Sequence, residues 1–192
     1  MLPTLRKVLI IAAVSIASVL AIAQASGNAE SEWRARVRQE LPLMGHRNWI
    51  AVVDSAYPLQ TSGGIETVET GADQIEVVQA VLDAIGKSGH VRPIIFTDAE
   101  LKAVPESDAP GVTAYRESLS KLLGRMDSGK IDAQALPHEQ IISKLDEAGR
   151  TFHILVLKST LTIPYTSVFI RLDCGYWTEE QETRLRERMG KK

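Results

Sequence analysis

Trp49-Ile50-Ala51-Val52-Val53 is an unbroken apolar run that ends at Asp54. A short run of this kind predicts a strand that is buried on both faces of a largely parallel sheet. Phe152 to Leu157 is a second strong strand candidate. Helical patterns alternate with such strands along the chain. This alternation favours a single layered α/β domain with a largely parallel or mixed central sheet flanked by helices.

Helix signals separate the strand candidates. Asp73 to Glu76 has the spacing of a capping box, so a helix is predicted to begin there and to end at Gly86. Pro137 opens another helix that runs to about Ala148. Further helices are expected at residues 32–41, 115–126 and 178–189.

Two more strand candidates carry polar residues. Val91 to Phe96 contains Pro93, which predicts an edge strand or an interrupted one. Tyr165 to Leu172 alternates with a period of two, so Tyr165 and Ser167 are expected to share one face while apolar residues occupy the other.

The first 25 residues have the pattern of a targeting segment. Arg6 and Lys7 precede an apolar run from Val8 to Ile22, and Ala23-Gln24-Ala25 supplies an A-x-A cleavage site. A retained membrane anchor is the alternative, but spanning a bilayer takes about 20 apolar residues. We therefore expect residues 1–25 to be a cleaved signal peptide. The domain at 26–192 is then exported to the periplasm or the extracellular space without a stable membrane anchor.

Composition limits the classes of partner. Removal of residues 1–25 leaves 20 Lys and Arg against 24 Asp and Glu, so the mature chain is mildly acidic and nucleic acid is not expected as a partner. Cys174 is the only cysteine, which predicts a buried inert thiol or an intermolecular contact. The four histidines are scattered along the sequence, and no metal site is expected. Phosphate-binding, zinc-protease, serine-hydrolase and dinucleotide-binding motifs are all absent.

Three stretches together resemble one family. Gly45 to Pro58 begins with a Gly-His turn and ends in Asp-Ser-Ala-Tyr-Pro, His138-Glu139-Gln140 follows, and Lys158 to Ser167 ends in Pro-Tyr-Thr-Ser. Their order and spacing resemble the ribose pyranase and fucose mutarotase family over roughly His46 to Gly175.

The resemblance implies a reaction and a set of site residues. Members of this family interconvert ring forms or anomers of a free monosaccharide, such as ribose or fucose, without a cofactor. It implies catalytic roles for His46, as the acid/base, and for Asp54, which would orient the imidazole or accept hydrogen bonds from sugar hydroxyls. His138, Tyr165 and Ser167 would bind the substrate. It also implies a ring-like homo-oligomer with sites near subunit boundaries.

Other interpretations remain open. Ser167 stands where the family has Asn, which favours a catalytically silent sugar-binding module as the alternative function. A structural ring-forming protein without a ligand is a third hypothesis. Taken without the family, His46 is explained by a turn, Asp54 by the start of a loop and His138 by the start of a helix.

Overall fold

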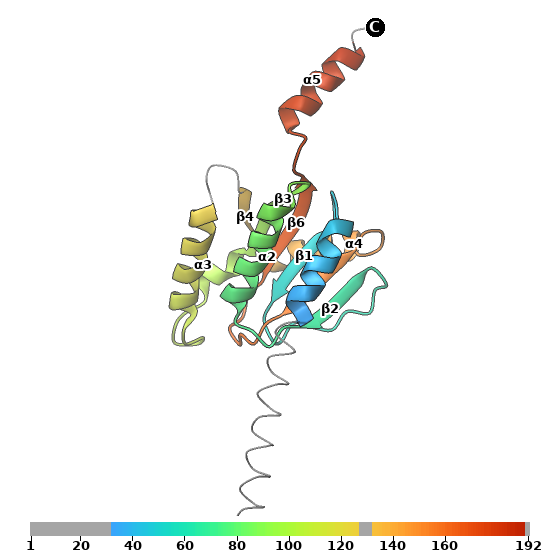
Figure 1. Ribbon diagram of the computed structural model, residues 1–192. Coiled ribbons are helices and arrows are strands. Elements are labelled where there is room, and N and C mark those ends of the chain that lie inside the picture. Colours follow the sequence, from blue (N-terminus) through green and yellow to red (C-terminus); the bar gives the residue numbers. More distant parts are fainter. Residues whose placement is uncertain (1–31, 127–131, 191–192) are drawn as a thin grey trace, which may run out of the picture.

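A mixed six-stranded sheet forms the centre of the computed structural model, which describes residues 32–126 and 132–190 (Figure 1). The strand order is β2-β5-β1-β6-β3-β4. The strands are β1 (Trp49–Val53), β2 (Ile65–Glu69), β3 (Val91–Asp98), β4 (Asp132–Leu136), β5 (Ile154–Lys158) and β6 (Val168–Cys174).

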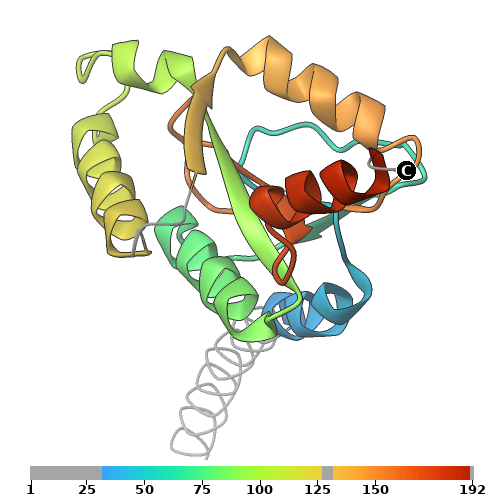
Figure 2. The same ribbon diagram turned by 90° about the horizontal axis from the view of Figure 1, so that it is seen from above.

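Helices cover both faces of the sheet, as Figure 2 shows from above. One face packs on a helical segment at 32–40, the 3-10 turn η1 (Leu41–Leu43), α2 (Gln74–Ser88) and α3 (Val112–Met126). The other face packs on α4 (His138–Ala148) through Ile141 and Leu145. The 3-10 helix η2 (Ala99–Ala103) follows β3, and α5 (Glu179–Gly190) extends away from the domain without a buried residue (Figure 1).

Strand direction creates two chemically different edges. β1 and β2 are parallel to β5, and β3 is parallel to β4, whereas β6 is antiparallel to both β1 and β3. The carboxyl ends of the five other strands therefore share one edge of the sheet with the start of β6. We call this the carboxyl edge. The end of β6 lies at the opposite edge, the amino edge, together with the starts of β1 and β3.

The sequence-based prediction of an α/β domain with a mixed sheet is confirmed. β1 has the predicted bounds, and its residues are buried on both faces of the sheet. Asp73 caps α2, since its Oδ1 accepts hydrogen bonds from the backbone N–H groups of Ile75 at 2.9 Å and Glu76 at 3.4 Å. Pro137 precedes α4 as predicted. Residues 1–25, the predicted signal peptide, lie outside the described residues.

The prediction of an edge position for β3 is wrong, because this strand lies between β6 and β4. Pro93 is opposite Leu172 in β6, and both backbone polar groups of Leu172 bond to the residues that precede β1. Pairing with β4 starts only at Ile94. Neither neighbouring strand therefore requires a backbone N–H group from residue 93. A proline is compatible with this internal position for that reason.

Several element boundaries differ from the predicted ones, and one strand was not predicted. Helix α2 continues past Gly86 to Ser88, and Gly89 ends it in the left-handed region with φ of 69°. β6 starts at Val168, because Tyr165 adopts φ of 58° and breaks the extended backbone. β4 was not predicted, since Asp-Ala-Gln-Ala-Leu has little intrinsic strand preference.

Gly64→Ala tests the close packing at the start of β2. A methyl group at Gly64 would meet the carbonyl oxygen of Gly149 and, at 2.8 Å, that of Phe152. Because both obstacles are backbone atoms, we expect the free energy of unfolding to fall by about 1–3 kcal/mol or more in urea titrations. Gly63→Ala is the matched control, since a methyl group there meets nothing within 4 Å. Equal stability of the two variants would contradict the predicted packing.

Candidate functional site

Three of the predicted site residues line one pocket at the carboxyl edge. Asp54, His138 and Tyr165 surround a hollow of about 380 Å³ together with the loops 55–58 and 162–164. They come from the end of β1, the start of α4 and the loop before β6. A larger hollow of about 610 Å³ lies between the 32–40 helical segment and α2 and contains none of the predicted site residues.

Asp54 is held by a local turn. Its Oδ1 accepts a hydrogen bond from the backbone N–H of Ala56 at 2.9 Å, which is an Asx turn. The backbone N–H of Ser55 donates to the carbonyl oxygen of Leu161 at 2.8 Å, so this turn is fastened to the loop that leads toward Tyr165. Among the described residues, the second carboxylate oxygen of Asp54 accepts no hydrogen bond. It is therefore available to a ligand.

His138 is fixed by two acidic residues. Its backbone N–H lies 3.1 Å from both carboxylate oxygens of Glu100, which caps the start of α4. Its ring Nδ1 lies 3.0 Å from Oδ1 of Asp98. The ring of Tyr165 meets the ring of His138 edge-on, with the centroids 5.8 Å apart. This orientation leaves the His138 ring only half-buried at the pocket.

Asp98 is a site residue that the sequence reasoning missed. It ends β3, its side chain is fully buried, and its Oδ2 has no hydrogen-bond partner in the described residues. Burial raises the pKa of Asp98, and the hydrogen bond from His138 offsets only part of this. Its position at the carboxyl end of a strand was the available signal, as for Asp54.

Tyr57 brings a second unpaired polar group to the pocket. Its side chain is 5% exposed, and its hydroxyl group has no hydrogen-bond partner within residues 32–126 and 132–190. Burial raises its pKa to about 12, with smaller contributions from nearby acids. Buried polar groups are nearly always hydrogen-bonded, so each of these two atoms can still take a partner.

A buried polar cluster holds the loop that carries Tyr165. The carbonyl oxygen of Thr166 accepts from the Tyr115 hydroxyl at 2.5 Å and from the Gln74 side-chain amide. The Gln74 Oε1 accepts from the Ser159 hydroxyl at 2.8 Å. These contacts fix both ends of the loop, and Tyr165 between them takes a left-handed backbone with φ of 58°. Strained backbone of this kind persists where the surroundings determine it, which is common at binding sites.

Ser167 is only 2% exposed and does not line the pocket. It lies next to the start of β6, behind the loop that carries Tyr165.

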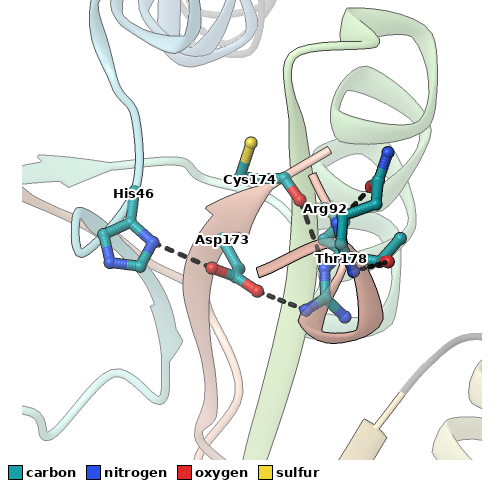
Figure 3. A network of polar contacts seen from close by, with 6 residues as sticks. His46, Arg92, Asp173, Cys174 and Thr178 are labelled. Carbon is teal, nitrogen blue, oxygen red and sulfur yellow. Dashed lines mark hydrogen bonds and ion pairs between the residues drawn. The ribbon is translucent and has the colours of Figure 1, made fainter. Parts of the chain in front are cut away.

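His46 lies at the other edge of the molecule. It precedes β1 whereas Asp54 follows it, and the five residues of β1 alone span roughly 13 Å. His46 lines a separate hollow of about 440 Å³ with Arg47, Lys144 and Arg171. Its Nδ1 lies 2.8 Å from Oδ1 of Asp173 (Figure 3). One copy of the chain therefore does not bring His46 and Asp54 to the same ligand.

Other groups contribute little to a site. Cys174 is a partly exposed free thiol. Among residues 32–126 and 132–190, no group of three His, Cys, Asp or Glu side chains is arranged to hold a metal ion. No helix in the same part of the chain is long and apolar enough to cross a bilayer.

Two solved structures match the chain with a TM-score of 0.51. Bacillus subtilis RbsD in complex with D-ribose is 15% identical, and the match covers 72% of this chain and 91% of RbsD. FucU from Bifidobacterium longum is 13% identical, and the match covers 72% of this chain and 94% of FucU. The chain has the RbsD and FucU fold. The resemblance that the sequence motifs indicated is thus confirmed at the level of the fold. No family model and no curated protein sequence matches the chain.

Tyr57→Phe tests whether the unpaired hydroxyl belongs to a binding site. Leaving a buried hydroxyl without a partner costs about 1–3 kcal/mol, so its removal should keep or raise the free energy of unfolding, by up to about 1 kcal/mol. D-Ribose, the sugar in the matching RbsD structure, is the probe for the pocket, and any affinity of the wild type for it should be lower in this variant. Tyr176→Phe, at a position that is 73% exposed, is the control and should change neither quantity. A clear loss of stability in Tyr57→Phe would mean that the hydroxyl is already paired within the protein.

Proposed function

We propose that the protein is a monosaccharide mutarotase or pyranase, which interconverts anomers or ring forms by opening and reclosing the hemiacetal. The observation that carries this proposal is the carboxyl-edge pocket, which Asp54, Tyr57, His138 and Tyr165 line and at which the buried Asp98 bonds to the ring of His138. Sugars present many hydroxyl groups that both donate and accept hydrogen bonds, so they suit a pocket lined by a carboxylate, an imidazole and two tyrosine side chains.

Ring opening moves two protons and needs no cofactor. A base removes the proton of the anomeric hydroxyl, the bond between the anomeric carbon and the ring oxygen breaks, and an acid protonates the ring oxygen. Reclosure on the other face, or through another hydroxyl, reverses these steps. His46 suits the acid/base role because imidazole titrates near neutral pH. Asp54 would accept hydrogen bonds from sugar hydroxyls, while His138 and Tyr165 would bind the ring.

A second copy of the chain is needed to unite these residues. His46 and Asp54 lie at opposite ends of β1, so a head-to-tail contact would place His46 of one copy against the pocket of the next. The charges are complementary, since the hollow beside His46 is lined by Arg47, Lys144 and Arg171 against the single acid Glu147, whereas Asp54 lines the other pocket. Head-to-tail contacts that close generate rings. We therefore propose a ring-like homo-oligomer with sites near the subunit boundaries.

Export is part of the proposal. The pattern of residues 1–25 supports cleavage of a signal peptide, which would deliver the domain at 26–192 to the periplasm or the extracellular space.

The second candidate function is a catalytically silent sugar-binding module of the same fold. The burial of Ser167 favours it, because the hydroxyl of a residue that is only 2% exposed offers a ligand less than the amide that the family carries at this position.

Saturation-transfer NMR with ribose, fucose, galactose and glucose tests the reaction. We expect the protein to speed exchange between anomers or ring forms of one sugar, and His46→Ala to lower that rate by about 10²–10⁴-fold, the usual contribution of general acid–base catalysis. His153→Gln changes a histidine outside both pockets and is the control. Binding without faster exchange would establish the silent module instead.

Mixing two inactive variants tests the shared site. His46→Ala damages the amino edge of a copy, and Asp54→Asn damages the carboxyl edge. A mixed ring contains some boundaries where an intact His46 meets an intact Asp54. We therefore expect partial recovery of exchange activity after the two variants are dissociated together and reassembled. If no mixture recovers activity although mixed oligomers form, the site does not lie between copies.

A further inference from the structure

Asp173 joins His46 to a second charged residue at the amino edge. Its Oδ1 lies 2.8 Å from Nδ1 of His46, and its Oδ2 accepts a hydrogen bond from the guanidinium of Arg92 (Figure 3). Arg92 also donates through Nε to the carbonyl oxygen of Cys174 at 3.3 Å. Each oxygen of the Asp173 carboxylate therefore has a side-chain partner, namely His46, which precedes β1, for Oδ1 and Arg92, near the start of β3, for Oδ2.

The backbone holds this arrangement in register. The N–H of Arg47 donates to the carbonyl oxygen of Leu172 at 3.0 Å, and the N–H of Leu172 donates to that of Asn48 at 2.8 Å. The Asn48 side chain closes the turn around His46 by accepting from the Gly45 N–H at 2.7 Å. These hydrogen bonds hold the backbone of the turn around His46 next to the end of β6. The side chains of His46 and Asp173 therefore start from fixed positions close to one another.

The environment keeps Asp173 ionised. Burial alone would raise its pKa, but the hydrogen bonds from His46 and the Cys174 N–H, together with the charge of Arg92, outweigh burial and hold the pKa below its usual value. An ionised carboxylate only accepts hydrogen bonds. Nδ1 of His46 must therefore carry the hydrogen, and in the neutral ring Nε2 is left with a free lone pair.

We propose that Asp173 is a positioning residue for His46, fixing the Nδ1–H tautomer so that Nε2 is the atom that exchanges a proton with the sugar. This inference rests on the proposed function of His46. The side chain of His46 is 57% exposed whereas that of Asp173 is 18% exposed, so the imidazole can reach a ligand while its orienting partner stays behind it. Figure 3 shows the second ring nitrogen pointing away from Asp173.

An ordinary surface ion pair is the competing explanation. Exposed ion pairs are held weakly, so a pair of that kind would not set the tautomer of His46, and replacing Asp173 would leave the ring unchanged. The tautomer of His46 separates the two explanations, because it reports on Asp173 directly and requires no sugar and no activity.

The test is long-range ¹H–¹⁵N NMR of the His46 ring in the purified protein, at a pH where the ring is neutral. We expect Nδ1 to be protonated in the wild type and the population to shift toward the Nε2–H form in Asp173→Asn. Asp173→Glu keeps a carboxylate and should restore part of the wild-type signal. Asp83→Asn replaces an exposed acid on α2 and should leave the spectrum unchanged.

Sugar exchange measured on the same samples completes the test. Asp173→Asn should lower the exchange rate by roughly 10- to 100-fold, as loss of an orienting partner commonly does, with less effect on sugar affinity. An unchanged tautomer in Asp173→Asn, or a changed tautomer with an unchanged rate, would overturn the proposal. A wild type that never speeds exchange would refute the proposed function, while a tautomer shift in Asp173→Asn would still support the orienting contact. If Asp173→Asn does not fold, Arg92→Gln removes the cation and should shift the same signal more weakly.

Discussion

The direction of β6 is the constraint on which both polar edges depend. This strand runs antiparallel between β1 and β3, in a sheet whose other strands all run the same way. Its start therefore reaches the edge where the parallel strands end, and its end reaches the edge where they begin. Because of this direction, the loop with Tyr165 lies beside Asp54 and His138 at the carboxyl edge. Asp173, at the other end of β6, contacts His46 at the amino edge. A parallel β6 would separate both groups of residues.

The buried amide of Gln74 turns this topology into a defined pocket. Gln74 is the first residue of α2, is fully buried, and bonds to both ends of the loop that precedes β6, through Ser159 and the backbone of Thr166. Tyr115 in α3 supports the same carbonyl group, and burial raises its pKa, so its hydroxyl stays a donor. A buried polar cluster with every member paired specifies one loop conformation. Tyr165, with its left-handed backbone, lies next to Thr166, the residue that this cluster holds.

Local signals in the sequence predicted most of the fold, and long-range contacts account for what they missed. Three features depend only on neighbouring residues and could therefore be predicted: the apolar run of β1, the capping box at Asp73 and the proline before α4. The internal position of β3 and the existence of β4 depend on which strands pair, which no local pattern encodes. The same holds for the site. Asp98 lies 40 residues from His138, and Asp173 lies 127 residues from His46, so each histidine was found by its motif and neither carboxylate was.

The two aspartate–histidine pairs differ in charge environment, and that difference suits a reaction that gives and takes protons. Asp98 is fully buried without a cation at its second oxygen, and burial raises its pKa. Asp173 is half-buried beside Arg92, and its hydrogen bonds and that cation hold its pKa below the usual value. Pairs of titratable groups whose environments push their pKa values apart mark the division between acid and base in many active sites. Under the proposed head-to-tail ring the Asp98–His138 pair of one copy would face the Asp173–His46 pair of the next across a sugar, whereas a single copy holds the two pairs at opposite edges.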